Sequence, residues 1–139
     1  MLRILRLDDK EEFLQLLNTF RPVNLEMTDE EFKTMWSYVN KTTITYVYII
    51  DENIGGTISV IRERKFINNG ALYAHIEDVV VHPHERGMGI ATKMVNEIID
   101  GCKLDDVYKI TLNCSTELEP LYKKCGFTNN GYQMIIKTK

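Results

Sequence analysis

The sequence is poor in cysteine and in long apolar runs, and each shortage excludes a class of protein. Its 139 residues include three cysteines, none of which forms a C-x-x-C pair. An odd count without close pairs argues against a disulfide framework and favours reduced thiols in the cytosol. No stretch approaches the roughly 18 apolar residues of a membrane span. Arg3 and Arg6 interrupt the N-terminal stretch MLRILRLDD before it can form the apolar core of a signal peptide. We therefore expect a cytoplasmic protein without a membrane partner.

The chain also lacks an excess of positive charge. The chain has 17 Lys and Arg residues and 20 Asp and Glu residues, which gives a net charge of −3. Nucleic-acid-binding domains are usually basic, so we expect no nucleic-acid partner, although a local positive site for an anionic ligand is compatible with this balance. There is no internal repeat and no linker rich in Pro, Gly or Ser. The length and this uniformity predict one domain spanning residues 1–139.

Hydrophobic periodicity predicts a mixed α/β fold. Alternating or β-branched runs favour strands at residues 2–7, 43–50, 57–67, 71–82, 107–114 and 132–137. Helical spacing favours helices at residues 8–20, 28–39, 90–102 and 117–127. Asp8 is a candidate cap of the first helix, and Thr28 with Glu31 forms a capping box at the second. The stretch DENIGG (51–56) and the stretch NNG (68–70) are typical of turns between strands.

A glycine-rich loop separates the strand ending at 82 from the helix beginning at 90. The first amides of a helix have no partner within it, and glycines let an anion approach them. Gly87 and Gly89 remove side chains from this loop, Arg86 adds a cation suited to phosphate, and Thr92 adds a hydroxyl. The loop therefore predicts a pyrophosphate cradle, with a simple tight turn as the alternative.

Two familiar phosphate motifs fit this loop poorly. A P-loop needs Lys-Ser or Lys-Thr after its second glycine, where this chain has Ile90-Ala91. A dinucleotide fingerprint needs Gly or Ala at position 92, where this chain has Thr92, and glycines directly after the strand, where this chain inserts HPHER. Asp105, however, lies at the distance along the chain expected for the acidic residue of that fingerprint.

The pattern Arg86-x-x-Gly89-x-Ala91, together with PLYKKCGF (120–127) and the element order, resembles the GCN5-related N-acetyltransferases (GNAT family). The resemblance covers almost the whole chain and is least specific before residue 50. It implies a GNAT fold with a central, largely antiparallel mixed sheet flanked by helices, and acetyl-CoA as co-substrate without a metal. The stretches RERK, HIEDVVV, YKITLNC and LYKKCGF are most similar to members that acetylate D-glucosamine 6-phosphate on the route to UDP-N-acetylglucosamine. This similarity also implies a homodimer in which each chain helps to complete the other's sugar site.

The resemblance assigns roles to particular residues. Tyr122 corresponds to the acid near the coenzyme sulfur, and backbone groups of residues 79–81 correspond to the groups that bind the pantetheine arm and polarise the thioester. The implied cofactor-binding residues are Val79, Val80, Val81, Arg86, Gly87, Met88, Gly89, Ile90, Ala91, Thr92, Tyr122, Lys123 and Lys124. Alone, Lys123 and Lys124 are also typical of a solvated helix face.

The implied substrate-binding residues are Lys65, Asn68, Glu77, Asp78, Asn113, Cys114 and Lys137. Adjacent strand residues point to opposite faces, so we expect Glu77 and Asp78 to diverge rather than to form a dyad. Glu77 is the candidate for deprotonating the amine through water. Lys65 and Lys137 suit a doubly charged phosphate, although a lone lysine is more often a surface charge.

Two positions depart from the family pattern. Asn113 replaces an acidic residue near the substrate amine, and an amide cannot accept a proton at neutral pH. Leu118 replaces a frequent asparagine, which removes a polar contact to the coenzyme. His82 and His84 have no third ligand nearby, so we expect no metal site. Neither Cys114 nor Cys125 has a visible His partner, which favours direct transfer in a ternary complex.

Three other functions are possible, and one feature of the sequence counts against each. A GNAT enzyme acting on a protein N-terminus or a polyamine would not need the basic anchors. A non-catalytic CoA-binding module would not need Tyr122. A dinucleotide-binding domain would not have consecutive strands at residues 43–82.

Overall fold

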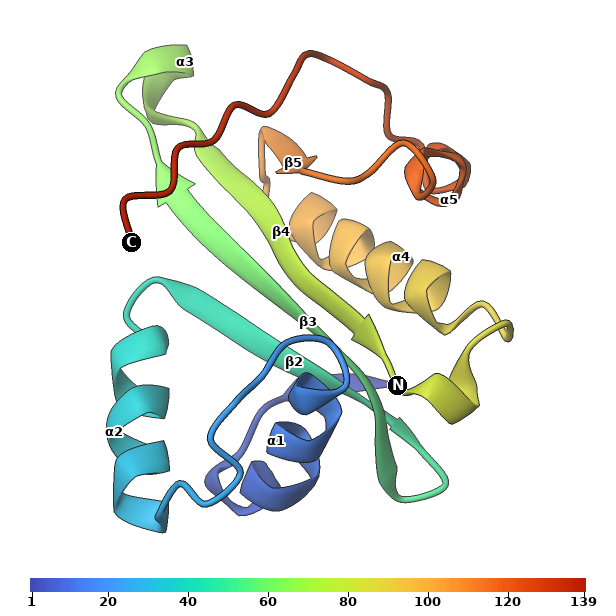
Figure 1. Cartoon of the computed structure of the whole chain (residues 1–139). Coiled ribbons are helices and arrows are strands. Elements are labelled where there is room, and N and C mark those ends of the chain that lie inside the picture. The colour runs from blue at the N-terminus through green and yellow to red at the C-terminus, as the bar shows by residue number, and fades with distance from the viewer.

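One five-stranded sheet organises the chain, for which the computed structural model describes residues 1–139. The strands lie in the order β1-β2-β3-β4-β5, antiparallel from β1 to β4 and parallel between β4 and β5 (Figure 1). The strands are β1 (Leu2–Ile4), β2 (Thr43–Ile50), β3 (Asn53–Arg64), β4 (Leu72–Val81) and β5 (Lys109–Leu112). The helices are α1 (Lys10–Asn18), α2 (Asp29–Val39), α3 (Ile67–Gly70), α4 (Ile90–Leu104) and α5 (Glu119–Lys124). The predicted mixed, largely antiparallel α/β fold is confirmed.

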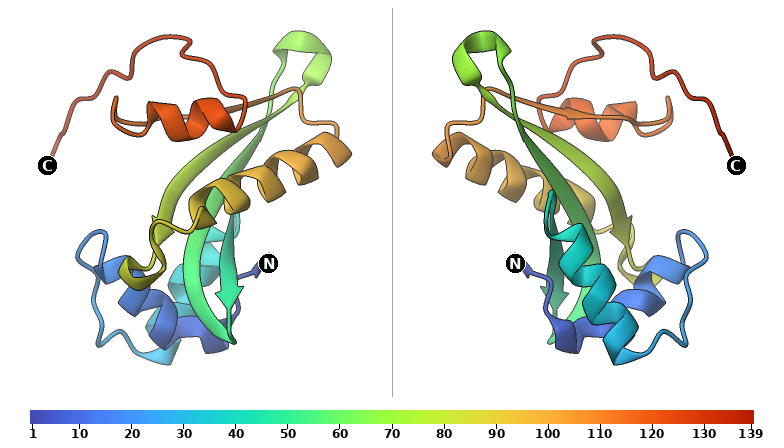
Figure 2. Two further views of the ribbon diagram at one scale, coloured as in Figure 1. Left: turned by 90° about the vertical axis from the view of Figure 1, so that its right-hand side faces the viewer. Right: turned by 90° about the vertical axis from the view of Figure 1, so that its left-hand side faces the viewer.

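Helices cover both faces of the sheet. On one face, α4 buries Met94, Val95 and Ile98 against strand residues such as Ile58 and Ile76. On the other face, α1 and α2 bury a second cluster around Leu16, Phe32 and Val47. Figure 2 shows α4 and α2 on opposite sides of the strands. None of the helices combines the length and the hydropathy that a membrane-spanning helix requires.

Side chains fix the helix starts much as the sequence predicts. The Thr28 hydroxyl accepts from the Glu31 amide (3.1 Å), and the Glu31 carboxylate accepts from the Thr28 amide (2.9 Å). This closes the predicted capping box at α2. The first helix begins later than expected, because a 3-10 turn at Leu7–Asp9 precedes it. There the Asp9 carboxylate, not Asp8, accepts from Arg3 (2.7 and 2.8 Å) and from the Arg6 amide (2.7 Å).

Both predicted strand connections exist, and the first is shorter than expected. Ile50 pairs with Asn53, so only Asp51 and Glu52 turn the chain, both with positive φ. Such a pair matches a two-residue hairpin loop. The following glycines therefore belong to β3, where a Cβ on Gly56 would lie 3.0 Å from the Met94 sulfur of α4. At the second connection, Asn68 and Asn69 take left-handed conformations (φ 51° and 58°) between β3 and β4.

The strand predicted at 132–137 does not form, and this prediction is wrong for the single chain. After Phe127, no backbone hydrogen bond joins the chain to another element. The segment extends away from the body (Figure 2). Tyr132, Met134 and Ile136 are 98%, 93% and 86% exposed. A strand needs a partner for its backbone groups, and this chain provides none for this stretch.

Candidate active site

A bulge in β4 shapes the centre of the candidate site. On β3, Thr57 pairs with Val80 and Ser59 with Glu77, so three steps along β4 oppose two along β3. The extra residue is accommodated at Asp78, whose φ is 50°. The bulge changes which face of the sheet alternate residues of β4 occupy. Ile76, before the bulge, packs towards α4, whereas Val80, after it, packs towards α1 and α2.

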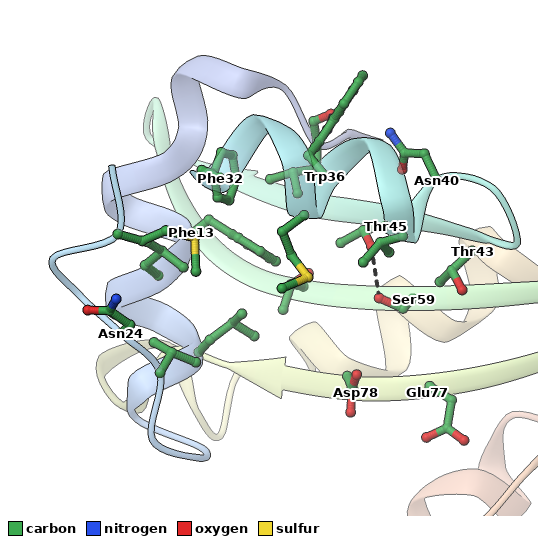
Figure 3. Close-up of a pocket in the computed structure, with 18 of the residues that line it drawn as sticks. Phe13, Asn24, Phe32, Trp36, Asn40, Thr43, Thr45, Ser59, Glu77 and Asp78 are labelled. Atoms are coloured by element: carbon green, nitrogen blue, oxygen red, sulfur yellow. Dashed lines mark hydrogen bonds between the residues drawn. The ribbon is translucent and has the colours of Figure 1, made fainter. Parts of the chain in front are cut away.

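The bulge overturns the expectation that Glu77 and Asp78 face opposite sides. Alternation predicts divergence only in a regular strand. Here both residues lie along the edge of the same pocket (Figure 3). Burial raises the pKa of the Asp78 carboxyl, and the neighbouring Glu77 raises it further. The two acids thus share one site without a hydrogen bond between them.

Beyond the bulge, β4 separates from β5. The parallel pairing ends at Ile76 and Leu112, one residue before Glu77 and Asn113. Backbone groups of residues 77–81 that point towards β5 therefore have no strand partner. This is the splayed strand that the predicted binding of a pantetheine arm at residues 79–81 requires. A peptide-like ligand can pair with such free donors and acceptors.

The glycine loop presents unpartnered amides at the start of α4. The first helical bond runs from the Lys93 amide to the Gly89 carbonyl (3.0 Å), so residues 90–92 have no intrahelical acceptor. Gly87 and Gly89 have φ of 81° and 74°, and a Cβ on either would meet nothing within 4 Å. Their role is therefore backbone conformation and open access rather than packing. A diphosphate fits such amides and the partial positive charge of the helix end.

Arg86 is anchored beside this loop. Its Nε donates to the Val81 carbonyl oxygen (3.3 Å), and its terminal nitrogens make no hydrogen bond. The side chain is exposed together with Met88 at the loop tip. The neighbouring His82 and His84 rings stack (5.1 Å between centroids), and no group of three potential metal ligands occurs.

Tyr122 is the buried residue of α5 and packs into the core cluster beside α4. It is 8% exposed and packs edge-on against Phe127, with 6.1 Å between ring centroids. Burial, and then the nearby Cys114 and Cys125 thiols, raise the pKa of its hydroxyl. A raised pKa keeps the phenol protonated at neutral pH, which is the state that a general acid needs.

The two lysines after Tyr122 lie on the exposed side of α5. Lys123 pairs with Glu119 one turn earlier (3.2 Å), whereas Lys124 has no ion pair. The solvated-face interpretation thus fits Lys123, and Lys124 is the cation that remains free for a coenzyme.

A pocket that the sequence did not reveal lies between α2, α1 and the sheet. Its volume is about 520 Å³, and its walls are mainly apolar (Figure 3). Thr45 and Ser59 form a hydrogen-bonded hydroxyl pair (3.2 Å) on its strand side. Glu77 and Asp78 lie at one edge of it. Helical periodicity indicated apolar faces on both helices, but the gap left between them depends on their packing.

A basic and aromatic corner forms at the β3–β4 connection. The Asn68 amide donates to the Tyr73 hydroxyl (2.6 Å), and the Lys65 Nζ lies 5.3 Å from the Tyr73 ring centroid. Lys65 also pairs with Glu63. Lys109 of β5 approaches the same ring at 4.8 Å, and Tyr108 stacks on it at 5.6 Å. Periodicity did not single out Lys109, Tyr73 or Tyr108, because only strand pairing brings them to this corner.

The remaining predicted substrate residues are divided. Asn113 and Cys114 are exposed just after β5, near the end of the β4–β5 pairing. Lys137 is exposed and lies in the extended C-terminal segment, after the last helix. One chain therefore brings together the glycine loop, the bulge, both carboxylates and Tyr122, but not Lys137.

The fold, with a splayed strand beside unpartnered amides at a helix start, is that of a GNAT acetyltransferase. A model of the acetyltransferase (GNAT) domain matches residues 10–135, so the chain belongs to this family. The glucosamine 6-phosphate N-acetyltransferase of Arabidopsis thaliana is 37% identical, over 96% of this chain and 93% of that protein. The glucosamine 6-phosphate N-acetyltransferase of Candida albicans is 27% identical, over 97% of this chain and 93% of that protein.

Solved structures agree with these sequence matches. The crystal structure of glucosamine-6-phosphate N-acetyltransferase from Arabidopsis thaliana superposes with a TM-score of 0.90 at 34% identity, covering 100% of this chain and 98% of that one. An acetyltransferase from Trypanosoma brucei gives 0.90 at 27% identity, with 99% and 98% covered. The fold that the sequence resemblance implied is thus confirmed.

Proposed function

We propose that this protein transfers the acetyl group of acetyl-CoA to the amine of D-glucosamine 6-phosphate, giving N-acetyl-D-glucosamine 6-phosphate and CoA. The observation that carries the proposal is the open glycine-lined start of α4 beside the bulged, splayed β4. The proposal is supported by relatives named glucosamine 6-phosphate N-acetyltransferase, whose matches cover almost the whole chain. The unpaired cysteines suit a reducing, cytoplasmic location.

The coenzyme is held by main-chain groups in this proposal. The amides of residues 90–92 and the Arg86 guanidinium bind its diphosphate, with Gly87 and Gly89 allowing close approach. Backbone groups of residues 79–81 pair with the pantetheine arm, and one N–H there donates to the thioester carbonyl. Donors held by a strand need no reorganisation when negative charge develops on that oxygen.

Two side chains manage protons during the transfer. Glu77 takes a proton from the ammonium group of the sugar, through water, so that the free amine can attack the thioester carbon. The carbon–sulfur bond then breaks, and Tyr122 donates its proton to the departing sulfur. Burial raises the pKa of the Cys125 thiol, which disfavours a thiolate nucleophile there and supports direct attack.

The sugar phosphate is bound at the basic corner. Lys65 provides one cation, Asn68 provides an amide, and Asp78 binds sugar hydroxyls. A phosphate with two negative charges favours a second cation, which Lys137 provides from another copy of the chain. Asn113 offers a hydrogen bond to the amine region without acting as a base.

We also propose that the active form is a homodimer in which each C-terminal segment joins the other copy. The exposed side chains of Tyr132, Met134 and Ile136 support this, because isolated chains rarely expose so many large apolar groups together. Phe66 and Ile67, at the tip of the β3–β4 connection, are also exposed at 105% and 64%. A second copy would cover such groups and give the segment a partner for its backbone.

Mixing two impaired variants tests this shared site, at a glucosamine 6-phosphate concentration well below the KM of Lys137→Ala. Tyr122→Phe and Lys137→Ala chains, mixed and allowed to exchange, form a heterodimer in which one of the two sites has both intact groups. Statistical exchange would restore about a quarter of the wild-type rate. No recovery, together with a monomer by light scattering, would refute the shared site.

The substrate is tested by following thiol release from acetyl-CoA. We expect turnover with glucosamine 6-phosphate, much weaker turnover with glucosamine, and little with peptide amines. A protein N-terminus is the second candidate acceptor, because the mainly apolar pocket beside Glu77 would suit an apolar side chain. Faster turnover of apolar-ended peptides than of the sugar phosphate would favour that candidate.

A further inference from the structure

A histidine that none of the predicted roles uses links Glu77 to β5. His75 precedes Glu77 by two residues on β4, and its Nε2 lies 3.0 Å from the Glu77 Oε1. Its Nδ1 lies 2.6 Å from the Thr111 Oγ1, on the β5 residue that pairs with it in the sheet. The three side chains form an unbroken hydrogen-bonded row across the two strands.

The row has a defined direction when the imidazole is neutral. Glu77, as a carboxylate, can only accept a hydrogen bond, so the His75 Nε2 carries a hydrogen and donates it to Glu77. Nδ1 is then an acceptor, and the Thr111 hydroxyl donates to it. A base whose hydrogen-bond partner is itself oriented by a third group is the usual arrangement for holding one reactive geometry.

We propose that His75 and Thr111 are positioning residues for Glu77, and that they hold one of its oxygens so that the other faces the incoming ammonium group. This inference rests on the proposed acetyl transfer. It gains weight from Asn113, because the position that could have shared the base role holds an amide. The row also reaches solvent, since Thr111 is exposed.

The surroundings of Glu77 leave this role to His75. The adjacent charged group on β4 is Asp78, a carboxylate that repels rather than anchors it. On β3 the paired residue is Ser59, whose hydroxyl is bonded to Thr45. On the β5 side the pairing has already ended. No lysine or arginine forms an ion pair with Glu77, and His75 is the side chain that contacts its carboxylate.

Steady-state kinetics with paired variants test the role. His75→Phe keeps a ring but removes the donor, and we expect kcat to fall about ten-fold, with the KM for acetyl-CoA and the melting temperature unchanged. Losing the donor disfavours the charged carboxylate, so the acidic limb of the pH profile of kcat/KM moves to higher pH. His75→Gln restores a donor near the Nε2 position and should recover most of the rate.

Thr111 provides the matched pair on β5. Thr111→Val has the same shape without a hydroxyl and should lower kcat by a smaller factor, about three-fold, whereas Thr111→Ser should behave as wild type. If His75→Phe and Thr111→Val lower stability or coenzyme affinity but leave the pH profile in place, the residues are structural and the proposal fails.

A nitrogen NMR experiment on the free protein tests the row without any substrate. We expect neutral His75 to be wholly the Nε2–H tautomer in wild type and a mixture in Thr111→Val, with His82 and His84 as internal references. His75→Gln assigns the signals by their loss. A mixed or Nδ1–H tautomer in wild type would overturn the proposal even in an active enzyme. The expected tautomer in a protein that does not acetylate the sugar would refute the proposed substrate alone.

Discussion

The coenzyme side and the acceptor side of the candidate site differ in how complete they are within one chain. On the coenzyme side, the start of α4, the bulged β4 and Tyr122 are fixed by local turns and by the core beneath α4. On the acceptor side, Lys65 and Asn68 form a corner near the surface, while Lys137 lies on an exposed segment. In our proposal, the coenzyme thus meets a preformed site, whereas the sugar phosphate also needs Lys137 from a second chain.

The largest expected effect is on the coenzyme side, at Tyr122. Tyr122→Phe keeps the ring packing and removes the proton donor, so kcat should fall about 100-fold or more. The affinity for CoA, measured by calorimetry, should not change. Equal losses in turnover and in CoA affinity would mean that the hydroxyl binds rather than donates.

The next effect separates the two sides most sharply. Removing residues 128–139 should raise the KM for glucosamine 6-phosphate about ten-fold or more, because a charged contact to the phosphate is lost. CoA affinity should stay at its wild-type value. Lys137→Ala separates the lost charge from the lost assembly, with Lys139→Ala as a matched control. A truncated chain with an unchanged sugar KM would make the acceptor side complete in one chain.

A smaller effect tests the backbone of the coenzyme side. Gly89→Ala places a side chain at φ 74°, which costs about 1–2 kcal/mol of folding stability and distorts the amides that bind phosphate. Gly101→Ala is the matched control within the same helix. A Cβ there meets nothing within 4 Å, and the change should stabilise the protein by about 0.5–1 kcal/mol. Thermal melts and CoA titrations of both variants give the comparison. Unchanged CoA binding in Gly89→Ala would exclude this loop as the phosphate site.

The smallest effect depends on pH and concerns Asp78. Since its folded-state pKa is raised, its ionisation opposes folding, and this penalty appears as the pH rises through that value. Asp78→Asn should therefore melt slightly higher than wild type at pH 7, and the difference should close near pH 3. A variant that is less stable at pH 7 would show that the carboxylate has a stabilising partner.

The same contrast governs what could be predicted from the sequence. Local signals located the capping box at Thr28, the turn at Asn68 and the glycine loop before α4, because each depends on neighbouring residues. Residues 132–137 have the alternation of a strand, but strand formation also requires a partner that one chain does not offer.

Within the site, the failures have a similar cause. The bulge lies at Asp78 rather than at a glycine, so the sequence gives no signal for it. The regular alternation of a strand therefore predicted Glu77 and Asp78 on opposite faces. The contact of His75 with Thr111 depends on the register of two parallel strands 36 residues apart. The volume of the pocket under α2 depends on how two helices pack, which periodicity does not specify.

The central claim is that the open amides at the start of α4 bind the diphosphate of coenzyme A. Calorimetric titration of the purified, folded protein with CoA, and in parallel with pantetheine, which lacks the diphosphate, tests it most directly. We expect one CoA per chain and much weaker binding of pantetheine. No detectable CoA binding, or equal affinity for both compounds, would contradict the claim.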